Sequence, residues 1–253
     1  MSEELYTPKI SVITTSYQHG DFIEDNIVSV INQNYSNYEH IIIDGGSTDH
    51  TLGILKKYPS LKWISEKDDG QADAFNKGLS LSKGDIIFWL NSDDYLCPNI
   101  FNEIVRYFNV NPKSKIVTGN LIMVDINKNF ITKYKPDNLT YDNLLNGGKN
   151  ATQPSTIIKK EVFDNVGYLN THFHYAMDKE FWIRMAKSYT IDTFNENVAC
   201  FRYYEGSKSY SHKIRFIKEW IYIGKIHHRR YLSKTNIIII KEILKYLLKK
   251  ILR

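Results

Sequence analysis

The sequence has little cysteine and no long apolar run, and each of these lacks excludes a class of protein. Its 253 residues include two cysteines, Cys97 and Cys200, which form neither a disulfide framework nor a metal-binding spacing, so a reducing compartment is expected. No run of about 18 uncharged apolar residues occurs, which argues against a membrane-spanning helix. The amino-terminal residues lack the basic and apolar regions of a secretory signal, so none is expected.

Charge is spread unevenly along the chain. The formal net charge is +5, yet residues 207–253 carry 13 Lys and Arg against 2 Asp and Glu, a net of +11. Residues 1–206 carry 20 against 26, a net of −6. An acidic body with a basic tail indicates chemistry in the body and attachment to an anionic partner through the tail.

The first half of the chain alternates short β-rich runs with helical patterns. The expected strands are Ile10–Thr15, Tyr38–Asp44, Leu61–Ser65 and Asp85–Leu90, and the expected helices are Asp21–Asn34, Thr48–Tyr58, Gln71–Ser82 and Pro98–Asn109. This alternation is typical of βαβ units. It predicts an α/β fold with a Rossmann-like, mostly parallel central sheet flanked by helices.

The second half reads differently. A hairpin is expected over residues 115–134, then a strand near 156–158, a helix over 178–188 and strands near 191–194 and 198–203. We expect residues 1–206 to form one mixed α/β domain, with the nucleotide-binding half first. Residues 207–253 read as a separate helical tail.

Asp93 and Asp94 follow the apolar run Ile86–Leu90, separated from it only by Asn91 and Ser92. Ligands bind at the carboxyl ends of such strands, and two adjacent carboxylates repel each other unless a cation lies between them. A divalent metal at this position indicates work on phosphates. The alternative is a helix start, since Asn and Asp are favoured there, but that role needs only one such residue.

A second turn, Asp44-Gly45-Gly46-Ser47-Thr48-Asp49, ends the strand at 38–44. Its glycines allow a sharp bend close to a ligand, and Asp44 can accept a hydrogen bond from a base or ribose. The alternative is a plain strand-to-helix turn in which Asp49 is a favourable first-turn charge.

Taken in order, these motifs resemble the nucleotide-sugar half of family 2 glycosyltransferases, which have the GT-A fold. The resemblance covers Pro8–Pro98 and continues less densely through Gln153-Pro154-Ser155 and Ala176–Trp182 to about Tyr204. It implies inverting transfer of a sugar from a nucleotide diphosphate donor, a UDP-sugar, to a saccharide or lipid-linked saccharide acceptor in cell-surface polysaccharide assembly. It also divides the body into a nucleotide-sugar half, 1–98, and an acceptor half, 99–206.

The resemblance assigns roles to particular residues. Those implied to bind substrate are Thr15, Ser16, Tyr17, Asp44, Asn91, Ser92, Asp93, Gln153, Glu180 and Trp182. Within this set, Asp44 is implied to hydrogen-bond the base, and Gln153 and Trp182 to line the acceptor or sugar pocket. The base and ribose are implied to lie along Thr15, Ser16 and Tyr17.

The same resemblance makes Asp93 and Asp94 the DxD-type motif that holds Mn²⁺ or Mg²⁺ on the diphosphate, and Asp178 the general base. Two departures stand out. Asn91 replaces an Asp that many members have, and Met177 replaces the usual Glu before the base, for which Glu180 could partly substitute. By position, His212 is a further candidate metal ligand.

In the tail, apolar residues of 237–252 flank a stripe of Lys241, Lys245 and Lys249. A basic amphipathic helix of this kind can lie in an anionic membrane interface, which suits a lipid-linked acceptor. The expected location is cytoplasmic, peripheral at the inner face of the cell membrane. The alternative is a helix that packs its apolar face on the body or on a second copy in a homodimer.

Three rival functions share some of these features. A nucleotidyltransferase that makes nucleotide sugars needs a Gly-rich basic phosphate loop after the first strand, which residues 14–18 lack. Nucleic acid is not an expected partner, because the isoleucine-rich face of the tail does not interleave aromatic and basic groups on a platform. A non-catalytic module that binds a sugar nucleotide stays open.

Overall fold

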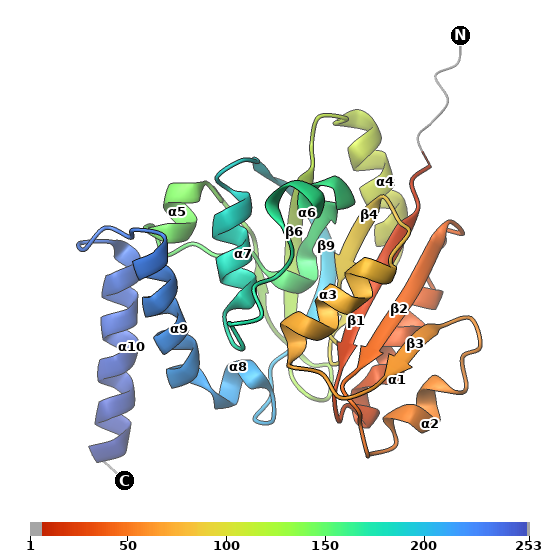
Figure 1. Cartoon of the computed structure of the whole chain (residues 1–253), viewed down its shortest axis with the longest axis horizontal. Helices are drawn as coiled ribbons and strands as arrows, with labels where there is room; N and C mark the ends of the chain where they lie inside the picture. The colour runs from red at the N-terminus through yellow and green to blue at the C-terminus, as the bar shows by residue number, and fades with distance from the viewer. Residues whose placement is uncertain (1–6, 252–253) are drawn as a thin grey trace.

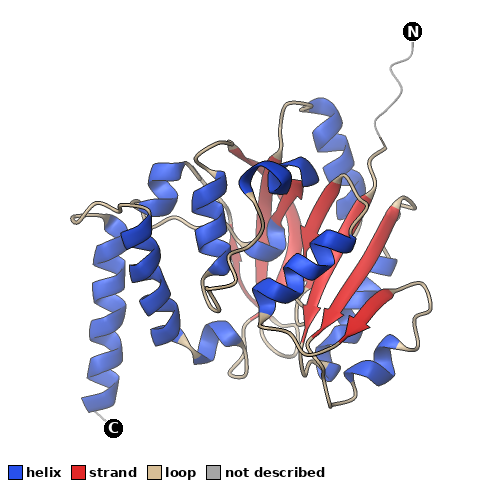
Figure 2. Cartoon of the chain, viewed as in Figure 1, coloured by secondary structure: helices blue, strands red, loops and turns tan. Residues whose placement is uncertain are grey.

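The chain is built around one mixed β-sheet with helices on both faces, as the computed structural model shows (Figures 1 and 2). The structure describes residues 7–251, and for residues 249–251 only the backbone. The Lys249 side chain and Leu252, which the amphipathic pattern includes, lie outside the described part. Within it, nine strands pair in the order β3-β2-β1-β4-β8-β6-β9-β5, with β7 on β6. The predicted α/β fold class is confirmed.

The four strands of the first half run parallel. They are β1 (Ile10–Ser16), β2 (Tyr38–Asp44), β3 (Lys62–Ser65) and β4 (Ile86–Trp89), connected through α1 (Gly20–Ile31), α2 (Thr51–Leu55) and α3 (Gln71–Leu81). Every residue of β1 and β4 is buried, and β1 pairs with β2 on one side and β4 on the other. The carboxyl ends of these strands therefore meet at one edge, where the strand order reverses.

The second half completes the sheet mostly, though not entirely, with antiparallel pairs. Its elements are β5 (Tyr95–Leu96), α4 (Ile100–Val110), β6 (Ile116–Val124), β7 (Phe130–Tyr134), α5 (Tyr141–Leu145), a 3₁₀ turn (Gln153–Ser155), β8 (Thr156–Lys159), α6 (Lys160–Val166), α7 (Met177–Met185) and β9 (Ile191–Arg202). The two strands expected near 191–194 and 198–203 form the single strand β9. The sequence predicts two strands because polar residues in the middle of β9 interrupt its apolar pattern. In the structure, a register shift against β6 lets this polar segment leave the regular strand pairing without ending the strand.

Strand alternation supplies two apolar faces. Ile13, Ile87 and Trp89 pack with Phe75 of α3 under α6 and α7, whereas the opposite face of the same strands packs against α1 and α4. The Phe75 and Trp89 rings lie 4.6 Å apart between centroids. Because both faces are buried, the strands hold their register firmly, and their polar ends are placed accurately.

The tail is helical, as predicted, and consists of α8 (Lys208–Ser211), α9 (Lys213–Ile226) and α10 (Lys234–Ile251). The last two form a hairpin at the left end of the molecule (Figure 1). Arg229 in their connection donates to the carbonyl oxygens of Leu145 and Trp220, both at 2.9 Å, which ties the hairpin to the body. Among the described helices, none combines the length and the apolar character needed to cross a bilayer.

Candidate active site

A cleft of about 680 Å³ opens at the carboxyl edge of β1 and β4, within the usual size range of small-molecule sites. Its walls come from the start of α3, the loop 150–154 and the start of α7. Residues 206–209, with His212 and Phe216, add a further wall, so the segment after β9 belongs to the cleft as much as the sheet does.

The structure brings seven of the predicted site residues to this cleft and leaves five away from it. The lining residues are Thr15, Ser16, Tyr17, Asn91, Asp93, Gln153 and Asp178; those that do not line it are Asp44, Ser92, Asp94, Glu180 and Trp182.

Asn91 is the centre of a hydrogen-bond network across the cleft floor. Its Oδ1 accepts from Gln71 Nε2 at 2.7 Å and Thr15 Oγ1 at 3.3 Å, and its Nδ2 donates to Gln153 Oε1 at 2.9 Å. An Asp here would have no N–H for Gln153, so the amide fits this network better than the family's usual carboxylate.

Lys208 Nζ extends the network, since it donates to Gln71 Oε1 at 3.2 Å. Gln71 and Lys208 both line the cleft, and sequence reasoning missed them. Gln71 could have been found from its place beside Gly70, a helix-start glycine at φ +107° that few other residues tolerate. No sequence pattern indicates Lys208 as a cleft residue, because the charge distribution predicts a tail that is separate from the body.

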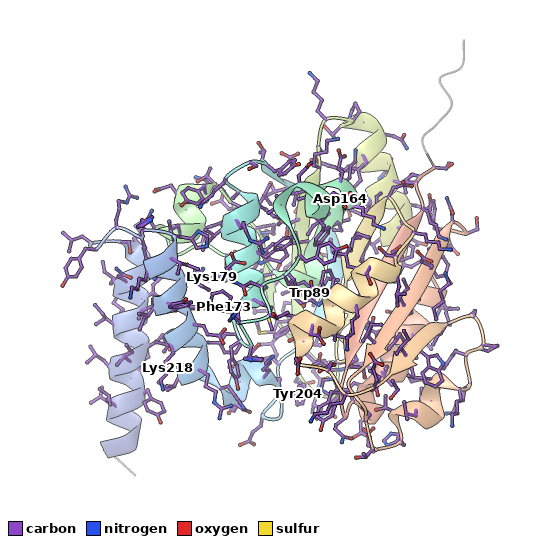
Figure 3. The ribbon with its side chains drawn as sticks, in the orientation of Figure 1. Trp89, Asp164, Phe173, Lys179, Tyr204 and Lys218 are labelled. Carbon is purple, nitrogen blue, oxygen red and sulfur yellow. The ribbon has the colours of Figure 1, made fainter. Side chains whose placement is uncertain are left out.

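Asp93 presents its carboxylate to the cleft. The Tyr204 hydroxyl donates to its Oδ2 at 3.4 Å, and Arg202 Nη1 donates to its backbone oxygen at 2.8 Å. Tyr204 lies at the carboxyl edge of the sheet (Figure 3). Arg202 therefore fixes the backbone from which the Asp93 carboxylate projects.

Asp94 faces the interior instead. It is fully buried, its Oδ1 accepts the Arg202 backbone N–H at 3.1 Å, and its Oδ2 has no hydrogen-bond partner among the described residues. Burial, and then the Asp93 charge, raises the pKa of Asp94 well above the ordinary aspartate value. The two neighbouring carboxylates thus have different surroundings, and Asp93 alone faces the cleft.

The donor set around Asp93 fits a divalent cation that the substrate helps to hold. Among the described residues, no group of three or more His, Cys, Asp or Glu side chains is arranged to hold a metal. Mg²⁺ is usually bound by one or two carboxylates together with substrate phosphates and water. A single exposed carboxylate at a strand end matches that pattern.

Asp44 organises its own turn. Its carboxylate accepts from the backbone N–H groups of Gly46 and Ser47 and from the hydroxyls of Ser47 and Ser65, at 2.5–3.2 Å. Gly46 has φ +81°, which favours glycine. Asp44 is fully buried, so its expected contact with a base stays a prediction.

Asp178 stands in the first turn of α7 and lines the cleft. Burial raises the pKa of its carboxyl group above the ordinary value, against the lowering effects of the Lys179 N–H and ammonium groups and of Lys208. A carboxylate poised in this way is better matched to accept a proton near neutral pH than an exposed aspartate.

Ser92, Glu180 and Trp182 serve the framework in this structure. Ser92 is buried and hydrogen-bonds His19 Nδ1 at 2.7 Å. Glu180 is buried against Arg184, whose Nη2 lies 2.9 Å from Oε2, and Trp182 is wholly enclosed in the core. Burial alone would raise the pKa of Glu180, but the neighbouring His227 ring and the hydrogen bonds from Arg184 outweigh it and lower the pKa.

Aromatic and cationic groups cover the end of the cleft beside α7 and α8. The Tyr175 ring stacks on His212 at 5.4 Å between centroids, and Lys208 Nζ lies 5.2 Å from the Tyr175 centroid. His212 thus lines the cleft in a stack, and its Nδ1 is buried without a hydrogen-bond partner among the described residues. Its candidacy as a metal ligand stays a prediction.

The sequence and fold were compared with known proteins. The model of the family described as glycosyl transferase family 2 matches residues 11–174. TuaG of Bacillus subtilis strain 168, a glycosyltransferase provisionally named for teichuronic acid biosynthesis, is 28% identical over 242 residues, covering 91% of this chain and 93% of TuaG. An uncharacterised glycosyltransferase of Rickettsia felis is 25% identical over 222 residues, covering 82% of this chain but only 36% of its own length.

Two solved structures have a similar fold. TarS 1–349 of S. aureus with UDP-GlcNAc gives a TM-score of 0.67 at 19% identity, covering 90% of this chain and 69% of that one. The mannosyltransferase PcManGT of Pyrobaculum calidifontis, with GDP-Man and Mn²⁺, gives 0.64 at 19% identity, covering 90% and 66%. At this identity the likeness establishes the fold alone.

Proposed function

Since the chain belongs to glycosyl transferase family 2, we propose that it moves a sugar from a nucleotide diphosphate donor, a UDP-sugar, to a hydroxyl of a saccharide acceptor, with inversion at the anomeric carbon. The observation that carries the proposal is that Asp93 and Asp178 line one cleft. One carboxylate stands at the tip of β4 and the other at the start of α7. This arrangement suits a reaction with an anionic leaving group on one side and a hydroxyl nucleophile on the other.

The donor binds at the end of the cleft formed by β1 and β4. Thr15, Ser16 and Tyr17 lie along the nucleoside, and the Ser16 hydroxyl, buried without a hydrogen-bond partner among the described residues, is available to it. Lys208 offers a positive charge to the diphosphate from the opposite wall. The turn that Asp44 organises shapes the wall beside the base.

Asp93 would hold Mn²⁺ or Mg²⁺ together with the diphosphate, while Asp94 supports the turn from beneath. When bound, the cation neutralises the charge that develops on the leaving nucleotide diphosphate. The chain's own contribution is to fix Asp93 in place through Arg202 and Tyr204. UDP-GlcNAc with TarS and GDP-Man with Mn²⁺ on PcManGT support a nucleotide-sugar donor and a cation by analogy.

Asp178 accepts the proton of the acceptor hydroxyl as that oxygen attacks the anomeric carbon. The raised pKa makes the carboxylate a stronger base than an ordinary aspartate. Direct displacement by this route inverts the anomeric configuration. Likeness to TuaG supports an acceptor in cell-surface polysaccharide assembly.

A panel of UDP- and GDP-sugars with Mn²⁺ or Mg²⁺ tests this function through thermal stabilisation and release of free nucleotide. Asp178→Asn should abolish transfer and leave donor-induced stabilisation nearly intact. Asp164→Asn is the matched control, because Asp164 is exposed and lies away from the cleft on α6 (Figure 3). Near-normal turnover of Asp178→Asn would refute the base, and donor binding without nucleotide release by the unmodified chain would point to a binding module.

The acceptor is placed at an anionic membrane surface by the α9–α10 hairpin. Tyr231 and Leu232 in its connection are 89% and 90% exposed. Apolar residues of α10 are also exposed: Ile237, Ile240, Leu244, Leu247 and Leu248. Lys241 and Lys245 are exposed beside them, so the surface combines apolar anchors with positive charge. Each basic residue near anionic lipid contributes about 1 kcal/mol to binding.

Co-sedimentation with anionic and zwitterionic vesicles tests this placement at the inner face of the cell membrane. The chain should bind anionic vesicles more tightly, and binding should weaken with salt. Replacing Leu244, Leu247 and Leu248 by Ser should release it, whereas Val110→Ser, at an exposed residue of α4, should not. A stable homodimer that ignores vesicles would assign the same face to a second copy.

A further inference from the structure

We propose that Glu219, on α9, is a positioning residue for Asp178, an inference that rests on the proposed role of Asp178 as the base. The Glu219 carboxylate accepts three consecutive backbone N–H groups, those of His174 at 2.9 Å, Tyr175 at 2.9 Å and Ala176 at 2.7 Å. These residues form the entry to α7, and Asp178 follows two residues later.

This entry has no local cap. The first N–H groups of a helix lack partners inside the helix and are usually satisfied by a Ser, Thr, Asp or Asn side chain at the N-cap. The N-cap residue here is Ala176, whose side chain has no acceptor. Glu219, from a helix more than 40 residues later in the chain, instead accepts the N–H of the N-cap residue Ala176 and those of the two residues before it, and its negative charge complements the positive end of α7.

The next residue of α9 holds the other side of Asp178. Trp220 lies under the ammonium group of Lys179, with Nζ 5.2 Å from the ring centroid. Lys179 is buried on the side of α7 that faces α9 (Figure 3). Glu219 and Trp220, which are consecutive in α9, therefore contact the chain just before and just after Asp178. The position of Asp178 thus depends on the tail helix α9.

Loss of the Glu219 carboxylate would leave three N–H groups without an acceptor and loosen the first turn of α7. Asp178 would then sample positions out of reach of the acceptor hydroxyl, while the donor end, built from β1 and β4, would stay intact. Misplacement of a catalytic group by about 1 Å can cost about 100-fold in rate. A positioning role therefore predicts a fall in kcat without a matching rise in the KM for donor.

The experiment compares Glu219→Ala and Glu219→Gln with Glu242→Ala, which alters a partly exposed glutamate of α10 that pairs with Lys245. Glu219→Ala should lower kcat about 10- to 100-fold with a donor KM within about twofold. Glu219→Gln, which keeps one acceptor oxygen, should recover part of the rate, and Glu242→Ala should match the unmodified chain. Circular dichroism at the assay temperature corrects each rate for the folded fraction.

A double-mutant cycle separates positioning from a merely structural role. In an Asp178→Asn background, Glu219→Ala should lower the residual rate no further, because the group that it positions is already gone. Three results would each overturn the inference and leave the proposed function standing. They are equal rate losses on Glu219→Ala in both backgrounds, an unchanged kcat in Glu219→Ala, and a rate loss that comes from a higher donor KM. Full turnover by Asp178→Asn alone would refute Asp178 as the base, and this inference with it, whereas donor binding without nucleotide release by the unmodified chain would overturn the proposed function.

Discussion

Arg202 offers the sharpest test of how the turn that carries Asp93 is held. Its side chain is 1% exposed, its Nη1 donates to the Asp93 carbonyl oxygen, and its Nη2 pairs with Asp25. The guanidinium also stacks against the rings of Phe22 and Tyr95, with centroids 5.2 and 5.1 Å from Cζ. Replacement by Met keeps most of the apolar stem and removes the charge and its donors.

The expected cost follows from these contacts. Two hydrogen bonds to a charged group contribute about 1.5–3 kcal/mol each, which gives a gross loss of about 3–6 kcal/mol. Asp25 keeps Lys128 at 2.6 Å and is partly exposed, so it is not left as a buried unpaired charge. Breaking this buried ion pair should therefore lower the free energy of unfolding by about 3 kcal/mol, the lower end of the usual range. That loss corresponds to a Tm drop of about 6–12 °C for a chain of this size.

Urea unfolding of Arg202→Met, followed by circular dichroism, measures this loss. Arg106→Met is the matched control, because its pairing with Glu103 is on the surface and should cost about 0–0.5 kcal/mol. We also expect weaker donor binding in Arg202→Met, since the backbone of Asp93 loses its support. A loss below about 1 kcal/mol with an unchanged m value would show that Arg202 does not hold this turn.

Two further predictions concern the carboxylates of the cleft. The folded-state pKa of Asp178 is raised, so the native state holds its proton more tightly than the unfolded chain, and ionisation at neutral pH costs stability. Asp178→Asn should therefore raise Tm relative to the unmodified chain near pH 7.5, and this gain should disappear as the pH falls below the ordinary aspartate pKa. If the variant and the unmodified chain had the same Tm at both high and low pH, the raised pKa of Asp178 would be refuted. EDTA should abolish transfer, and added Mn²⁺ should restore it. Asp93→Asn should raise the Mn²⁺ concentration required, whereas Asp94→Asn should chiefly change stability. The reverse pattern in the two variants would make Asp94 the metal ligand.

The strands and their polar tips were predictable because their signals are local. Buried apolar runs ended at Asp44 and Asn91, and parallel pairing alone brings such ends to one edge. The direction of neighbouring side chains was not predictable in this way. Asp93 and Asp94 are adjacent in sequence, yet the turn sends one carboxylate to the cleft and the other to the backbone of Arg202.

Helix geometry explains why only one of the three site residues predicted on α7 lines the cleft. Asp178 opens the helix beside the cleft, whereas Glu180 lies about 200° further round and Trp182 one turn deeper, inside the core. The partners of Asn91 come from α3 and from the loop before β8, 20 and 62 residues away, and no local pattern announces them. The same holds for Glu219, whose N–H partners lie 43–45 residues earlier.

The cleft wall formed by residues 206–216 has a practical consequence for anyone who shortens or extends this polypeptide. A cut after residue 206 looks natural on charge grounds, but it would strip Lys208 and Phe216 from the cavity and Glu219 from the entry to α7. The smallest working enzyme should therefore retain everything through the α9–α10 connection, including Arg229, which clamps that connection to Leu145. A purification tag or reporter is better joined ahead of β1, at the opposite side of the molecule from the hairpin (Figure 1).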